Sequence, residues 1–255
     1  MSSVESLTGC VAFWDFDRTL QSRGDATLDL REISNTWEWV RDGIFGTTCA
    51  RIHPGGGFYI PRREIADLDI YGPHCELSVC VWFLRESPDP WQALAGVWDE
   101  SHRKRQYYLF LNARSRTLNG TTVRVECANR VHGHVSDVGG PTSDLACCVT
   151  YASGATEVPL RRWTMAAMTY KEAMVRVYVN GVLDACEESN PFDAPASIFD
   201  GGREGADFTI GTNSVRGGWS NHFGGLVGGV AVFCRALTDR EILKIGGAKR
   251  ANEPV

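Results

Sequence analysis

The sequence contains no uninterrupted apolar stretch of about 18 residues, the length that a helix needs to cross a membrane. It has no block of basic residues, and its net charge of −5 argues against binding to nucleic acid phosphates. The first residues, MSSVES, lack the basic and then apolar pattern of a secretory signal. We therefore expect a cytoplasmic protein that binds neither membranes nor nucleic acids, although export by another route would leave the same pattern.

Motifs of several common enzyme classes are also missing. The sequence has no GxSxG nucleophile elbow, no phosphate-binding P-loop and no dinucleotide-binding fingerprint. It has nine cysteines but no CxxC pair, which disfavours a zinc ribbon. Cys10, Cys80, Cys127 and Cys234 lie in apolar, strand-like runs, where a thiol behaves as a small hydrophobic group. We predict that most of the cysteines are reduced and buried, as is usual in the cytoplasm.

What the sequence does contain is a hydrophobic pattern with a period of two, which indicates β-strands. The expected strands cover residues 10–16, 50–52, 57–60, 76–85, 92–98, 106–112, 121–127, 130–136, 163–170, 173–179, 207–211 and 226–233. One helix is expected at 238–245, where Thr238 and Glu241 have the spacing of a capping box. We predict one all-β domain over residues 1–255, with its core at about 8–246 and a polar C-terminal tail.

Three stretches of the sequence resemble a known family. The first is VAFWDFD at 11–17, and the second joins WTMAAMTY at 163–170 to VRVYVNGV at 175–182. The third comprises FTIG at 208–211, FGGLVGGVAVF at 223–233 and RALTDREI at 235–242. Their order and spacing are similar to the laminin-G-like and pentraxin-like branch of the concanavalin A-like lectin/glucanase superfamily. The resemblance implies a two-sheet antiparallel jelly-roll sandwich with a short C-terminal helix, and carbohydrate as the partner, but no particular activity.

One departure from this family concerns calcium. The family commonly carries acidic residues where this chain has Gly228 and Gly229, which weakens any transfer of its calcium-linked ligand binding. Asp15 and Asp17 leave two alternatives open, since they could bind a structural calcium ion or satisfy the amide groups of a turn. No other cofactor is indicated, and the residues do not identify a metal.

Strand alternation predicts which polar side chains share a face. Apolar residues at alternate positions assign the core face of each strand, and the remaining positions form one open face if the strands are neighbours. That face would carry Trp98, Glu100, Gln106, Tyr108, His132, His134, Arg176 and Tyr178, with Arg105 and Arg130 beside it. Flat aromatic rings stack on sugars, while arginine, glutamine and histidine bind hydroxyl or carboxylate groups.

We expect from this face a protein that binds an oligosaccharide or polysaccharide and cleaves it as a lyase or a hydrolase. In a lyase, His134, His132 and Tyr108 would be catalytic, removing a proton from the sugar and protonating the leaving oxygen. A hydrolase needs two carboxyl groups, for which Glu100 and Glu126 qualify.

Other interpretations stay open at this point. The two histidines could hold zinc with Glu100 or His222 as a further ligand. The glycine-rich segment 217–222 could clamp a ligand with Trp219 and His222, or its tryptophan could fold onto the core. The protein could also be a non-catalytic lectin-like module, or an interaction domain whose exposed aromatics form an assembly surface.

Overall fold

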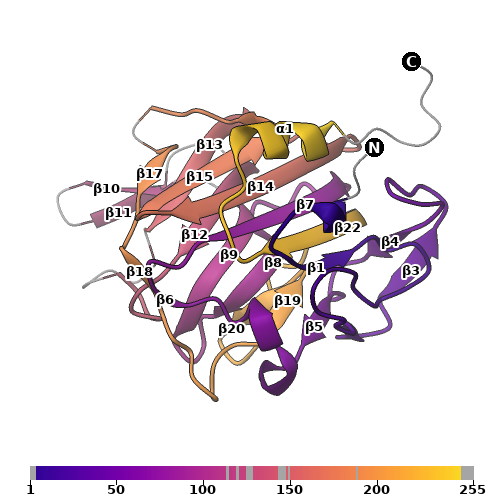
Figure 1. Cartoon of the computed structure of the whole chain (residues 1–255), viewed down its shortest axis with the longest axis horizontal. Coiled ribbons are helices and arrows are strands. Elements are labelled where there is room, and N and C mark those ends of the chain that lie inside the picture. Colours follow the sequence, from indigo (N-terminus) through magenta and orange to yellow (C-terminus); the bar gives the residue numbers. More distant parts are fainter. Residues whose placement is uncertain are drawn as a thin grey trace.

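Two β-sheets pack face to face in this protein (Figure 1). The computed structural model describes residues 4–112, 115–118, 121–124, 129–142, 148, 150–187 and 189–247. Within these residues each large sheet has nine strands, and two further strand pairs form small separate ribbons. We call the large sheet that contains β7 (Leu77–Arg85) sheet 1, and the one that contains β9 (Lys104–Asn112) sheet 2. The predicted antiparallel jelly-roll sandwich is confirmed.

Sheet 1 has the order β16-β15-β14-β7-β22-β4-β3, with β1 beside β22 and β17 beside β15. Its other strands are β1 (Cys10–Trp14), β3 (Trp37–Val40), β4 (Cys49–Ile52), β14 (Trp163–Lys171), β15 (Met174–Val179), β16 (Val182–Leu183), β17 (Phe192–Asp193) and β22 (Gly225–Phe233). Strands β7 and β22 are buried along their whole length, which explains their nearly unbroken apolar sequences. The Asn180-Gly181 turn joins β15 to β16, and both residues have the positive φ that a tight hairpin turn requires.

Sheet 2 has the order β13-β12-β9-β8-β19-β5-β2, extended by the hairpin of β20 and β21. Its other strands are β2 (Arg31–Glu32), β5 (Phe58–Ile60), β8 (Gln92–Asp99), β12 (Arg130–Val135), β13 (Tyr151–Glu157), β19 (Phe208–Ile210), β20 (Asn213–Val215) and β21 (Gly218–Ser220). The small ribbons pair β6 (Gly72–Pro73) with β18 (Ser197–Ile198), and β10 (Ser115–Leu118) with β11 (Thr121–Arg124). The helical segments are η1 (Val4–Ser6), η2 (Arg62–Glu64), η3 (Ala66–Leu68) and α1 (Asp239–Gly246).

The main core lies between the sheets, as the alternation in β12 shows. Val131 and Val135 are fully buried in this core, and Gly133 lies between them on the same side of the strand. A Cβ atom at Gly133 would come within 2.9 Å of the Val177 side chain and 3.0 Å of Met168, which belong to sheet 1. The close approach of the two sheets therefore requires glycine at this position. It also means that the intervening histidines of β12 point outward.

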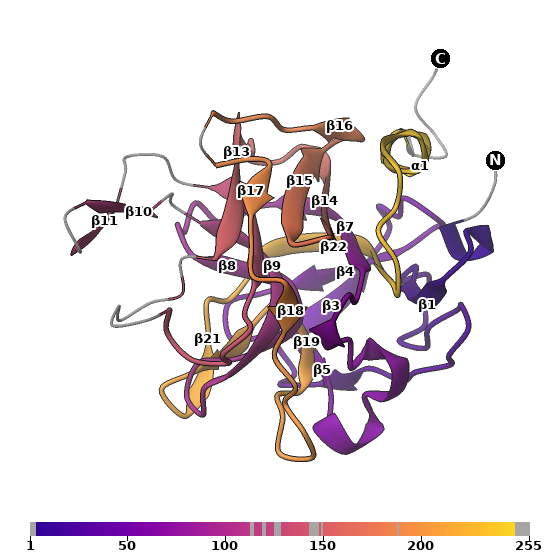
Figure 2. The ribbon, with the colours of Figure 1, turned by 60° about the vertical axis from the view of Figure 1, so that its left-hand side comes forward.

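Part of the outer face of sheet 1 is covered by α1, which Figure 2 shows on the opposite side of the sandwich from β8, β9 and β21. The helix begins after Thr238, and the predicted capping box with Glu241 is present. The hydroxyl of Tyr178 donates a hydrogen bond to Asp239 of this helix at 2.8 Å, and Arg176 lies on the same face, half-buried. Placing Arg176 and Tyr178 on one face with the histidines was therefore wrong, because β15 belongs to the other sheet.

Gly228 and Gly229 lie in β22 under an aromatic cover. A Cβ atom at Gly229 would lie 2.6 Å from the ring of Phe45, and one at Gly228 would lie 2.9 Å from the ring of Trp163. An acidic side chain would have no space here. The structure thus gives a steric reason why this chain lacks the acidic residues that the family commonly carries at these two positions.

The sequence pattern located most strands but missed several short or polar ones. Each expected strand has a counterpart, although residues 125–127 lie outside those described. Strand β13 was missed because its sequence, YASGATE, is rich in small residues and shows little hydrophobic alternation. Strand β3, with the sequence WEWV, does alternate and could have been found. Among the described residues, no helix is long and apolar enough to cross a membrane.

The cysteines that can be placed differ in their exposure to solvent. Among the described residues Cys10, Cys49, Cys80 and Cys148 are buried, whereas Cys234 is exposed. The prediction of burial was therefore wrong for Cys234, which comes directly after the last residue of β22. Burial, together with nearby acidic groups, raises the pKa of Cys10 to about 12, so this thiol is not a nucleophile at neutral pH. Cys127 lies outside the described residues.

Candidate functional site

The outer face of sheet 2 has two halves that differ in accessibility. The closed half is a cluster of aromatic and imidazole rings that comprises Trp98, Tyr108, Phe110, His132, His134 and Tyr151. His132 is 1 % exposed and His134 is 7 % exposed, so the prediction that both lie on a face open to solvent is wrong. Alternation placed both rings on the correct side of the sheet, but other side chains cover that side.

His134 lies at the centre of this ring cluster. Its ring centre is 4.5 Å from that of Tyr151, 5.1 Å from Phe110 and 5.5 Å from the ring of Trp98. Neither ring nitrogen has a hydrogen-bond partner among the described residues. Burial, with additional effects of His132 and Arg105, holds the pKa of His134 well below its ordinary value. The neutral ring packs as an aromatic group, and little of it is exposed to solvent.

His132 is held by the strand that the sequence pattern missed. Its Nε2 lies 3.0 Å from the hydroxyl oxygen of Ser153 in β13, and its ring stacks on Tyr151 at 4.9 Å. Both partners occupy alternate positions of β13 on the same outer face. His132 thus packs between its neighbours, and the part of the chain that the structure describes places no set of ligands around it that could hold zinc.

Tyr108 is fully buried between the two halves of the face. Its hydroxyl lies 2.7 Å from the carbonyl oxygen of Thr212, to which it donates, and 3.0 Å from the hydroxyl of Thr209. Burial raises the pKa of Tyr108 far above its usual range, with a small opposing effect of Thr209. The expected proton transfer by Tyr108 therefore has neither access to substrate nor an available phenolate. Its hydroxyl instead fixes the end of β19.

A β-bulge reverses two further assignments. Val97 pairs with Tyr107, but the next residue, Trp98, pairs with Arg105, so Gln106 is the extra residue. Arg105 therefore lies beside Trp98, with its guanidinium carbon 5.9 Å from the ring centre and Nη2 3.7 Å from the Glu100 carboxylate. Arg105 is buried, and Figure 1 shows β8 and β9 side by side.

Gln106 is buried elsewhere, contrary to the expected open face. Its amide nitrogen donates to Asp69 at 3.0 Å, and its amide oxygen accepts from Arg62 at 3.1 Å. Arg130 is half-buried at the start of β12, opposite Asn112 and Glu157. The expected binding set is thus divided among the ring cluster, this polar network and the far sheet. Glu126, the second carboxyl group considered for a hydrolase, lies outside the described residues.

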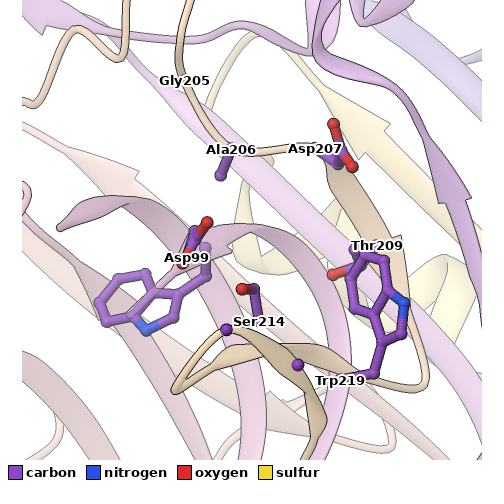
Figure 3. Close-up of a pocket in the computed structure, with 10 residues that line it drawn as sticks. Asp99, Gly205, Ala206, Asp207, Thr209, Ser214 and Trp219 are labelled. Carbon is purple, nitrogen blue, oxygen red and sulfur yellow. The ribbon is translucent and has the colours of Figure 1, made fainter. Parts of the chain in front are cut away.

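The open half of the outer face contains a hollow of about 300 Å³ between β8, β19 and the β20–β21 hairpin (Figure 3). Its lining residues are Trp98, Asp99, Gly205, Ala206, Asp207, Thr209, Ser214, Gly217, Gly218 and Trp219. Two of them, Trp98 and Trp219, were predicted to bind substrate. Sequence reasoning missed the polar residues, because only the fold brings the end of β8 next to the start of β19 and to β20.

Trp219 is presented to solvent by a tight hairpin. Val215 pairs with Gly218, and the two turn residues, Arg216 and Gly217, both have the positive φ of a two-residue β-turn. The Trp219 side chain is 39 % exposed, and its ring centre is 6.0 Å from that of Tyr59. Of the two interpretations of this segment, the structure supports the displayed tryptophan. Trp98 is nearly covered, and its indole N–H donates to Glu100 at 3.3 Å.

His222, the other candidate from this segment, has a different setting. It is half-buried, and its Nδ1 has no hydrogen-bond partner among the described residues. It is not part of the lining of the hollow. Of the two candidate residues in this segment, only Trp219 therefore lines the hollow.

Two carboxylates line the hollow and differ in their surroundings. Asp99 accepts hydrogen bonds from the amides of Ser101 and His102 and contacts the His102 ring at 2.8 Å. Burial alone would raise the pKa of Asp99, but these hydrogen bonds outweigh it and the net shift is downward. For Asp207, burial is the largest effect and raises the pKa, and the charge of Asp99 adds to it, despite a hydrogen bond from the amide of Arg62.

No metal site is evident in the described part of the chain. It contains no group of three or more histidine, cysteine or acidic side chains placed to hold an ion. Asp15 forms an ion pair with Arg23 at 2.6 Å, while one oxygen of Asp17 accepts from the amides and hydroxyls of Thr47 and Thr48. These contacts correspond to the turn-capping alternative. Burial opposes them, yet the hydrogen bonds lower the pKa of Asp17 overall.

Comparison with known families agrees with this architecture. Residues 64–243 match the Laminin_G_3 family, described as the concanavalin A-like lectin/glucanases superfamily. The chain belongs to this superfamily. No curated protein matches the chain in a sequence comparison. The matched residues include all four strands around the hollow, β8, β19, β20 and β21.

Several solved structures share the superfamily fold at low sequence identity. One is domain 4 of AbnA, an extracellular arabinanase from Geobacillus stearothermophilus, in complex with arabinotriose; it is 18 % identical, with a TM-score of 0.59 over 94 % of this chain and 98 % of that one. Another is the CBM40 of the Ruminococcus gnavus IT-sialidase bound to α2,3-sialyllactose, 16 % identical, with a TM-score of 0.52 over 78 % of this chain and 96 % of that one. At these identities the likeness establishes the fold alone.

Proposed function

We propose that this protein binds carbohydrate in the hollow of sheet 2, with Trp219 as the stacking platform. The observation that carries the proposal is a half-exposed indole at the edge of an open hollow whose other walls are mostly polar. A sugar ring has apolar C–H faces and a rim of hydroxyls, which match a flat aromatic ring flanked by hydrogen-bonding groups. Two structures with the same fold hold arabinotriose and sialyllactose, which supports carbohydrate as the ligand class.

Binding without cleavage is the simplest form of this function. The three residues expected to catalyse a lyase reaction, His132, His134 and Tyr108, are buried in the ring cluster and do not line the hollow. A lyase needs a base that reaches the sugar carbon. The burial of these groups therefore favours the lectin-like alternative over the lyase.

The test is binding of wild-type protein to a panel of neutral and acidic oligosaccharides, followed by calorimetry on each hit. Replacing Trp219→Ala should weaken binding about 30-fold, as expected for a tryptophan at the centre of a binding surface. Trp219→Phe, which keeps a flat ring, should retain most of the affinity. Leu243→Ala removes another exposed apolar side chain, on α1 at the far side of the sandwich, and serves as the control. Unchanged affinity in Trp219→Ala would contradict the proposal.

Hydrolysis is a second candidate, favoured by the opposed pKa shifts of Asp99 and Asp207 in one hollow. One carboxyl group kept ionised and another whose pKa is raised are the two roles that a glycosidase requires. Incubation of each binding oligosaccharide with the protein, followed by product analysis, separates the two candidates. Products that disappear in both Asp99→Asn and Asp207→Asn would establish hydrolysis, and intact ligand after prolonged incubation would leave binding alone.

A further inference from the structure

We propose that the hollow selects uncharged saccharides and rejects uronate and sialic acid ligands, because both of its ionisable lining groups are carboxylates. This inference rests on the proposed binding function and adds the class of sugar. The lining includes Asp99 and Asp207 but, among the described residues, no lysine, arginine or histidine. An acidic sugar entering the hollow would bring a third negative charge without a cation to pair with it.

The cations nearest to the hollow are already engaged. The guanidinium of Arg62 donates twice to Asp69, at 2.8 and 2.6 Å, and once each to Gln106 and to the carbonyl of Gly202. Only the backbone amide of Arg62 reaches Asp207, at 2.7 Å. Four of the five N–H donors of the Arg62 guanidinium are therefore engaged within the protein, and its charge is already paired with the Asp69 carboxylate.

Other basic side chains near the hollow are also paired or lie outside it. Arg63, whose charge lowers the pKa of Asp207, pairs with Glu64 at 3.0 Å and does not line the hollow. Arg105 is buried against Trp98, with Glu100 at 3.7 Å. The ring of His102 points its Nδ1 at Asp99. Arg216 is exposed at the tip of the β20–β21 hairpin and does not line the hollow. The charge that a ligand meets in the hollow is therefore negative.

The two carboxylates have different parts in this selection. The oxygens of Asp99 already accept from two amides and contact the His102 ring, so Asp99 acts mainly as a fixed charge. Asp207 uses Oδ1 for the amide of Arg62, and its Oδ2 has no hydrogen bond within the described part of the chain. A carboxylate only accepts hydrogen bonds, and sugar hydroxyls can donate them. Asp207 is therefore the lining residue placed to recognise a hydroxyl and to repel a carboxylate.

The experiment compares matched ligands that differ only in charge. Each neutral hexose oligosaccharide that binds is measured against its C6-oxidised uronate and against the methyl ester of that uronate. We expect oxidation to weaken binding at least about tenfold and esterification to restore most of it. The penalty should shrink as salt is raised, because the charges at an open site are screened. This salt test uses the wild-type protein and does not depend on the folding of a variant.

Asp207→Asn keeps the acceptor for the amide of Arg62 but removes the charge, and should reduce the penalty for the uronate several-fold. Asp193→Asn, at an exposed position in β17 of the far sheet, should leave it unchanged. Equal or tighter binding of the uronate, with Trp219→Ala still weakening it, would overturn the charge selection while leaving the proposed function intact. If no saccharide in the panel binds the wild-type protein, the proposed function fails and the selection falls with it.

Discussion

The two halves of the outer face of sheet 2 contain similar residue types but offer different chemistry. The ring cluster around His134 has aromatic and imidazole groups with almost no exposure, whereas the hollow beside Trp219 is open. In both halves the outward-facing residues alternate along their strands with residues of the same buried core, so the sequence pattern does not distinguish the two halves. The comparison shows that alternation assigns a side chain to one side of a sheet, but whether solvent reaches that side depends on what else packs there.

The difference comes from the segments that lie next to each half. On the closed half, Cys148 packs with the ring cluster, and the hydroxyl of Thr150 donates to the carbonyl oxygen of Val135 in β12. On the open half, the neighbouring element is a hairpin with a two-residue turn, and Trp219 of this hairpin remains 39 % exposed. Histidine therefore serves packing in one half, and tryptophan remains available for a ligand in the other.

The largest effect is expected where the two halves meet, at Tyr108. Tyr108→Ala removes a fully buried aromatic ring and should lower the free energy of unfolding by about 3–5 kcal/mol, measured by urea denaturation. Tyr108→Phe keeps the ring and loses only the hydrogen bonds to Thr209 and Thr212, so its cost should be about 1–3 kcal/mol. Because Thr209 lines the hollow, Tyr108→Phe should also weaken ligand binding. Unchanged stability in Tyr108→Ala would show that the ring cluster is not a closed, packed unit.

The next largest effect is expected in how the free energy of unfolding depends on pH, through His134 in the closed half. The unfolded chain titrates His134 near the ordinary pKa of 6.5, whereas the folded protein holds the pKa well below it. Between these values the unfolded state binds the extra proton, so stability is full above pH 6.5 and falls as the pH is lowered. The slope from this one group is at most about 1.4 kcal/mol per pH unit.

His134→Phe should remove this contribution, because a phenyl ring fills the site without titrating. Unfolding measured from pH 7.5 to 5 should show a shallower loss of stability in His134→Phe than in the wild type. His53→Gln, at an exposed histidine outside the ring cluster, is the matched control. Identical slopes in His134→Phe and the wild type would indicate that the imidazole is open to solvent after all.

The smallest effect is expected at Arg176, which sharpens the comparison from the other sheet. Arg176 lies on the outer face of sheet 1, so Arg176→Ala should not change binding of any saccharide in the hollow. Its effect on the free energy of unfolding should stay within about 0.5 kcal/mol, as for most surface substitutions. A large loss of affinity in Arg176→Ala would contradict the proposal, because it would indicate that the saccharide binds to sheet 1 and not to sheet 2.

The sequence by itself determined most of the strands and the capped helix, because these depend on local alternation, tight turns and cap residues, whereas the two-sheet sandwich was implied by the family resemblance. It also determined that His132 and His134 point away from the core, since Val131 and Val135 must point into it. The sequence did not predict the bulge in β9, because one extra residue moves Gln106 and Arg105 to new positions without altering the composition of the strand.

Only the tertiary structure decided which outward side chains reach solvent and which come together. Asp99 and Asp207 are 108 positions apart in the sequence, and they share a hollow because β8 and β19 pair in the sheet. Arg176 and His134 are closer in sequence but lie on opposite outer faces, because their strands belong to different sheets. Strand order and the covering of a face depend on long-range packing, which no local pattern of residues encodes.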